Sequence, residues 1–229
     1  MNELLSISIL PVVLTLLAYR AGVFLQQKTK SPICNPILVA VILVLAFLGV
    51  SGMELQTYQT GASFLTWLIT PATVCLAISM YEQFRILRKN TAVILAGVAA
   101  GAIACLFMVL GLCLLWSFDR ALTVSLLPKS VTTAIGVPLS QLAGGIAPIT
   151  TASIILTGII ASVLGPILCR IFRLTDEIAR GAAFGTAGHV VGTAKAHELS
   201  KLTGAVSSLS LVVAGLLTAI VLPVLTNFL

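Results

Sequence analysis

Long apolar runs dominate the chain, and their lengths predict membrane-spanning helices. A spanning α-helix needs about 20 predominantly apolar residues. Six runs approach or exceed this length, and each is expected to cross a bilayer. They are Leu4–Leu25, Ile33–Val50, Gly61–Met80, Thr91–Trp116, Ile146–Cys169 and Leu202–Leu229. The pattern therefore predicts an all-α, polytopic membrane protein with about six spanning helices.

Two further apolar stretches, Ala121–Gly145 and Gly181–His197, are interrupted by polar islands. The islands run from Pro128 to Gly136 and from Gly185 to Lys195, and they are rich in glycine, threonine and basic residues. In lipid, a broken helix is tolerated only where protein or a water-filled cavity satisfies the freed backbone groups. Basic side chains at bilayer depth are functional candidates by default. We therefore expect a solute to be handled at these islands.

Basic residues in the loops orient the predicted helices. Cytoplasmic loops of membrane proteins carry an excess of Lys and Arg. Three clusters have this character and are expected inside, which places the N-terminus outside; they are Lys28 with Lys30, Arg85 with Arg88 and Lys89, and Arg170 with Arg173 and Arg180. For these clusters to lie on the same side, each interrupted stretch must begin and end on one side of the membrane. The sequence predicts two re-entrant helical hairpins that enter from opposite faces, with tips near the midplane. If one of them spans instead, the C-terminus changes sides.

An internal repeat at an offset of 57 residues supports this topology. Each copy would contain one broken element and one span, so successive copies would be inverted, as in many secondary transporters. The Pro71 element would be a third broken helix. The matching positions are Gly158 and Gly215, Pro166 and Pro223, and Pro71 and Pro128. We interpret residues 1–229 as one transmembrane domain. Residues 1–60 form two N-terminal helices, and residues 61–229 form a repeat-containing core.

Composition excludes several classes of protein. Hydrophobic residues make up 59% of the chain and charged residues 9%, whereas soluble domains contain about 25% charged residues. The net charge of +6 reflects basic loops, so no nucleic-acid partner is expected. The cysteines are not spaced as zinc ligands or as a redox pair, and we interpret them as packing residues. No catalytic triad, nucleotide loop or metal cluster is visible, so we expect no enzyme, cofactor or metal site.

The chemistry of the islands favours an anionic ligand. Lys129, His189 and Lys195 are the basic candidates for a site within the interrupted stretches, and no carboxylate accompanies them at that depth. Half-helix N-termini add partial positive charge and unpaired N–H donors. Hydroxyl groups that cap these half-helices or contact the ligand are expected from Ser130, Thr132, Thr133, Thr186 and Thr193. His189 also titrates near neutral pH in its unperturbed state, which raises proton coupling as a hypothesis.

Each of these residues also has a purely structural interpretation. Lys129 at the outer interface would extend its ammonium to water. His189 would be a hydrogen-bonded core histidine, and Lys195 would lie near the cytoplasmic surface. The series of glycines from Gly181 to Gly192 would be a close helix-packing face. The sequence leaves both interpretations open.

The island motifs resemble those of a known family. Residues 127–133 (LPKSVTT) and 185–196 (GTAGHVVGTAKA) are similar to signatures of the LrgB/CidB family. Asn35-Pro36, the segment 71–77 and the segment 204–209 also resemble that family, so the likeness covers nearly the whole chain. One departure is Gly188, where the family usually has serine.

The resemblance implies a multi-pass protein of a bacterial plasma (inner) membrane, with two functional hypotheses. One is a carrier of small organic anions of the glycolate, glycerate, pyruvate or lactate class, because a chloroplast glycolate/glycerate translocator is related to the family. The other is a holin-like or antiholin-like modulator of murein hydrolase activity and lysis. That function would involve a small LrgA/CidA-type membrane partner and homo-oligomers. The polar islands favour the carrier.

Overall fold

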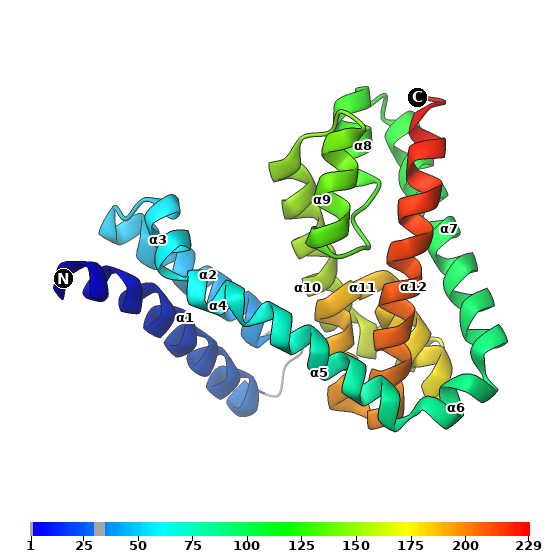
Figure 1. Ribbon diagram of the computed structural model, residues 1–229, viewed down its shortest axis with the longest axis horizontal. Coiled ribbons are helices and arrows are strands. Elements are labelled where there is room, and N and C mark those ends of the chain that lie inside the picture. The colour runs from blue at the N-terminus through cyan, green and yellow to red at the C-terminus, as the bar shows by residue number, and fades with distance from the viewer. Residues whose placement is uncertain (1, 30–34) are drawn as a thin grey trace. The chain divides into compact units, whose positions relative to one another are not determined.

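The computed structural model describes residues 2–29 and 35–229, and the secondary structure of these residues is helical (Figure 1). Lys30 and Cys34 lie outside the described residues. The chain divides into two compact units, residues 1–75 and 76–229. This boundary falls within α5.

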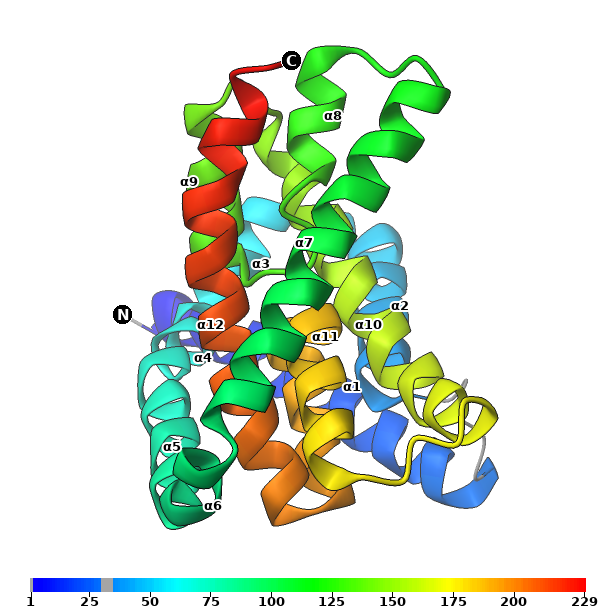
Figure 2. The same ribbon diagram turned by 90° about the vertical axis from the view of Figure 1, so that its right-hand side faces the viewer.

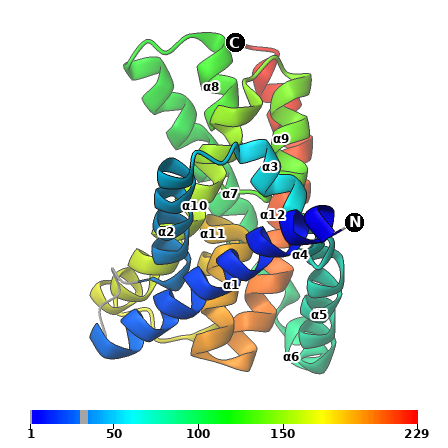
Figure 3. The ribbon, with the colours of Figure 1, turned by 90° about the vertical axis from the view of Figure 1, so that its left-hand side faces the viewer.

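Unit one contains a pair of packed helices, α1 and α2 (Figure 3). Asn35 caps α2, because its Oδ1 accepts a 2.9 Å hydrogen bond from the Ile37 N–H, and the helix begins at Pro36. The hydroxyl groups of Thr15 and Tyr58 lie 2.6 Å apart and tie α1 to α3. The helices of this unit are α1 (Asn2–Thr29), α2 (Pro36–Ser51), α3 (Leu55–Gly61), α4 (Ser63–Trp67) and the first half of α5 (Ile69–Glu82).

Four helices in the described part of the chain are long and apolar enough to span a membrane, within α1, α7, α10 and α12. The second predicted span corresponds to α2, which has only 16 residues. The third predicted span is not one continuous helix, because the chain breaks at Leu68 between α4 and α5. This agrees with the prediction of a broken element at Pro71. Pro71 explains the break, since it lacks an N–H and its ring clashes with the carbonyl four residues earlier.

Unit two contains the long helices and both interrupted stretches (Figures 1 and 2). One buried apolar cluster joins α7 to the first half of α12, and a second joins α7 to Leu127 and Leu222. The helices are the second half of α5, α6 (Phe84–Lys89), α7 (Thr91–Leu115), α8 (Arg120–Leu126), α9 (Thr133–Leu142), α10 (Ala147–Ile171), α11 (Glu177–Leu199) and α12 (Lys201–Thr226).

The first interrupted stretch is a helical hairpin, which we call hairpin A (residues 120–142). Its arms are α8 and α9, and its tip is the non-helical segment 127–132. At its base, Arg120 Nη2 donates a 3.2 Å hydrogen bond to the Thr226 carbonyl at the end of α12. The Ile146 N–H donates to Ser125 Oγ at 2.7 Å, so a side chain satisfies the backbone where the chain enters α10.

The second interrupted stretch, hairpin B (residues 177–199), also reverses direction. The backbone leaves the helix at His189, with φ 41° and ψ −135°. The arms are residues 177–188 and 190–199, and they pack together, because Phe184 and Ala196 share a buried cluster. Both arms lie along the beginning of α12. A Cβ on Gly181 would lie 2.6 Å from the Thr203 carbonyl, and His197 Nε2 bonds the Ser208 hydroxyl at 3.2 Å.

The two hairpins therefore enter from opposite ends of α12, as predicted. α10 leads from the base of hairpin A to the base of hairpin B, and α12 returns in the opposite direction (Figure 2). Each repeat thus consists of one hairpin followed by one long helix, and the second copy is inverted. Pro166 and Pro223 occupy matching positions inside the long helices. The Pro71 element differs, because α5 continues after its break without forming such a hairpin.

Candidate functional site

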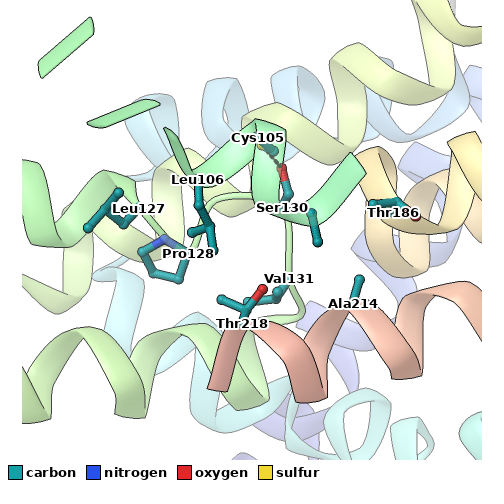
Figure 4. Close-up of a pocket in the computed structure, with 10 residues that line it drawn as sticks. Cys105, Leu106, Leu127, Pro128, Ser130, Val131, Thr186, Ala214 and Thr218 are labelled. Carbon is teal, nitrogen blue, oxygen red and sulfur yellow. Dashed lines mark hydrogen bonds between the residues drawn. The ribbon is translucent and has the colours of Figure 1, made fainter. Parts of the chain in front are cut away.

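The two tips meet between α7 and α12 (Figure 4). Pro128, Ser130 and Val131 come from hairpin A, and Thr186 comes from hairpin B. Together with residues of α7 and α12, they line a small void of about 10 Å³.

Lys129 lies at the tip of hairpin A and is partly buried. Its Nζ donates to Ser130 Oγ at 3.2 Å and to Cys105 Sγ at 3.5 Å. The Ser130 hydroxyl and the Cys105 thiol are themselves 3.2 Å apart. An ammonium has three protons to donate, and among the described residues Lys129 forms no ion pair.

His189 is 4% exposed at the tip of hairpin B. Its Nε2 lies 2.9 Å from the Ile154 carbonyl of α10. A carbonyl only accepts, so Nε2 carries the proton and donates. Gly158 provides the space, because a Cβ there would lie 2.6 Å from His189 Cε1. Nδ1 of His189 and Oγ1 of Thr186, which is 6% exposed, are buried without a hydrogen-bond partner.

A helix begins at each tip. In hairpin A, α9 starts at Thr133, and the preceding Thr132 is extended but makes no side-chain capping bond. In hairpin B, the second arm starts directly after His189. Helix N-termini present unpaired N–H groups and about half a positive charge. Together with Lys129, these termini make the meeting point of the tips electropositive.

Two clefts lead to Lys129, one on each side of the first arm of hairpin B. The α7 cleft, of about 500 Å³, lies between α7 and this arm and reaches from Asp176 to Lys129, Ser130 and Thr186. The α10 cleft, of about 520 Å³, lies between α10 and the arm and reaches from Leu174 to Lys129. Both extend toward the α10–α11 connection, which the positive-inside rule predicts to be cytoplasmic.

The structure brings four predicted site residues to the tips, namely Lys129, Ser130, Thr186 and His189. Thr132 is half-buried at the start of α9, and Thr133 is exposed. Thr193 is buried and bonds the Ser207 hydroxyl of α12 at 2.8 Å, which gives it a packing role between helices. Lys195 pairs with Glu198 at 2.6 Å near the base of hairpin B.

Sequence reasoning missed three residues that line the clefts. Cys105 was interpreted as a packing residue, yet it contacts both Lys129 and Ser130. Thr157 of α10 and Asp176 at the start of α11 also line the clefts. Only Thr157 had a sequence signal, because its neighbour Gly158 belongs to the internal repeat.

Gly192 holds the arms of hairpin B together, and Gly192→Ala is expected to destabilise the protein. A Cβ at this position would lie 2.5 Å from the Phe184 carbonyl, so the arms must separate, and overpacking of this kind costs about 1–3 kcal/mol. Gly111→Ala in α7 is the matched control, since its Cβ would meet nothing within 4 Å. Thermal unfolding in detergent measures both; equal stabilities would contradict the close approach.

The long apolar helices and the two opposed hairpins define a polytopic membrane protein. A model of the LrgB-like family matches residues 15–228, and the chain belongs to the LrgB family. The departure at Gly188 has a packing reason in this chain, because a Cβ there would lie 2.7 Å from that of Ala161.

Curated relatives cover nearly the whole chain. It is 34% identical over 225 residues to the holin-like protein CidB of Staphylococcus epidermidis, which covers 98% of both proteins. It is 36% identical over 214 residues to the antiholin-like protein LrgB of Bacillus subtilis, 93% of both. The uncharacterized protein YwbG of Bacillus subtilis is 34% identical over 222 residues, 97% of this chain and 99% of YwbG. No solved structure matches the chain.

Proposed function

We propose that the protein is a non-enzymatic membrane carrier for small organic anions of the glycolate, glycerate, pyruvate or lactate class. The observation that supports this most is the Lys129 ammonium at the meeting of two opposed hairpins, without an ion-pair partner among the described residues. A carboxylate there would accept from Lys129, from the Ser130 or Thr186 hydroxyl, and from helix N-terminal N–H groups.

Alternating access is the transport mechanism that this arrangement favours. The void between the tips is about 10 Å³, whereas the clefts on the cytoplasmic side are about 500 and 520 Å³. This asymmetry is what an inward-facing state would have. Movement of one hairpin and its long helix against the other copy would open the opposite side, as in other inverted-repeat carriers.

The names of the relatives support a second candidate function, and they support it more directly than they support the carrier. The CidB relative is named holin-like and the LrgB relative antiholin-like. In this second proposal the protein modulates murein hydrolase activity and lysis through homo-oligomers and an LrgA/CidA-type partner. None of the three reported names mentions transport.

Uptake and leakage measurements on purified protein in proteoliposomes distinguish the carrier function from the holin-like function. The carrier proposal predicts saturable uptake of labelled glycolate or pyruvate, together with retention of a trapped fluorescent dye. Dye leakage that accompanies anion entry, without saturation, would instead support a pore of the holin kind.

A further inference from the structure

The α10 cleft differs in chemistry from the α7 cleft, although both end at Lys129. Its lining is mainly aliphatic and includes Ile160, Leu164 and Leu168. Along α10 the lining extends from Thr157 to Cys169, twelve residues apart, which corresponds to about 18 Å of helix. This length and a volume of about 520 Å³ accommodate an extended alkyl chain.

The charges around this cleft favour an anion that has an apolar tail. Lys129 lies at the inner end, and the lining contains no carboxylate, whereas Asp176 lines the α7 cleft. At the mouth, Arg180 Nε donates a 2.5 Å hydrogen bond to the Leu174 carbonyl, and Leu174 lines the cleft. A cation at an entrance attracts anions from solution.

The orientation of a ligand in the α10 cleft also matters, because Lys129 lies at the inner end of the cleft. A bilayer phospholipid places its head group at the surface and its acyl chains inward. In the α10 cleft such a lipid would bring a methyl end against the Lys129 ammonium. A water-soluble carboxylate that enters head first places its charge at Lys129 and its tail along Leu164 and Leu168.

We propose that the α10 cleft binds the alkyl tail of aliphatic monocarboxylates whose carboxylate is held by Lys129. This inference rests on the anion site at Lys129 in the proposed function, but it concerns binding and does not require transport. Because such a ligand comes from water, each buried methylene contributes up to about 0.8 kcal/mol, or roughly fourfold in affinity. Octanoate is thus expected to bind more tightly than hexanoate, and hexanoate more tightly than propanoate.

Two tryptophan substitutions distinguish the clefts. Leu164 and Val93 are exposed aliphatic residues, 43% and 69%, and each lines only one of the two clefts, the α10 cleft and the α7 cleft respectively. Leu164→Trp fills the α10 cleft and is expected to weaken octanoate binding by about tenfold while leaving propanoate binding unchanged. Val93→Trp is the matched control and is expected to leave the dependence on chain length intact.

The measurement is equilibrium dialysis of radiolabelled octanoate against the protein in phosphatidylcholine nanodiscs, with the shorter carboxylates as competitors. Empty nanodiscs and Lys129→Met protein define non-specific partitioning. Equal affinity across the series, or equal effects of the two tryptophans, would overturn this inference alone. Displacement of octanoate by added phosphatidylglycerol would also overturn it, because the occupant would then be a bilayer lipid. Failure of every carboxylate to bind would count against the proposed function as well.

Discussion

Lys129→Met is expected to abolish most saturable uptake of small carboxylates into proteoliposomes. Lys129 is the cation at the meeting point of the tips, where it bonds Ser130 and Cys105. A hydrogen bond to a charged group contributes about 1.5–3 kcal/mol, so its loss weakens anion binding by roughly 10-fold to 100-fold. Initial uptake rates over a range of glycolate concentrations measure the effect.

Lys195→Met is the matched control for this experiment. Lys195 is a lysine of hairpin B that pairs with Glu198 near the base, and exposed ion pairs of this kind contribute about 1 kcal/mol or less. Its loss is therefore expected to change uptake little. If the two variants have the same uptake, Lys129 is not the anion site.

His189→Leu is expected to destabilise hairpin B by about 2–3 kcal/mol, because it removes a buried hydrogen bond to the Ile154 carbonyl. The strained backbone at this position, with φ 41°, is common to all non-glycine variants, so it cancels in the comparison. His189→Gln retains an N–H donor for Ile154. We expect the glutamine variant to stay close to wild type in thermal stability and to keep most of its uptake.

This pair of variants separates a positioning role from proton coupling. If His189 only positions the tip against α10, the glutamine variant retains the pH profile of uptake. A glutamine variant that is stable but has lost this pH dependence would contradict the positioning role. It would instead support the imidazole as the proton-coupling group, as the sequence suggested.

Much of the fold follows from local sequence signals. Helix-breaking residues in apolar surroundings marked both hairpins, and loop charges assigned them to opposite ends, because topology alternates with each crossing. The break at Leu68 was expected only from Pro71, because the rest of the predicted span reads as one apolar run of sufficient length.

The site was less predictable, because side-chain partners come from distant helices. The sequence makes Thr193 a candidate ligand residue, but in the structure its hydroxyl bonds Ser207 of α12. The sequence indicates a packing role for Cys105, but in the structure its thiol accepts a hydrogen bond from Lys129 at the tip of hairpin A. The pairing of Lys195 with Glu198, in contrast, follows from the helical spacing of three residues.

Accessibility of single cysteines from each side of the membrane tests opposed hairpins most directly. Gln141 near the base of hairpin A and Glu177 at the base of hairpin B are both exposed. In a background without native cysteines, Gln141→Cys is expected to react with an impermeant thiol reagent only from outside. Glu177→Cys is expected to react only from the cytoplasmic side. Labelling of both positions from the same side would contradict the account.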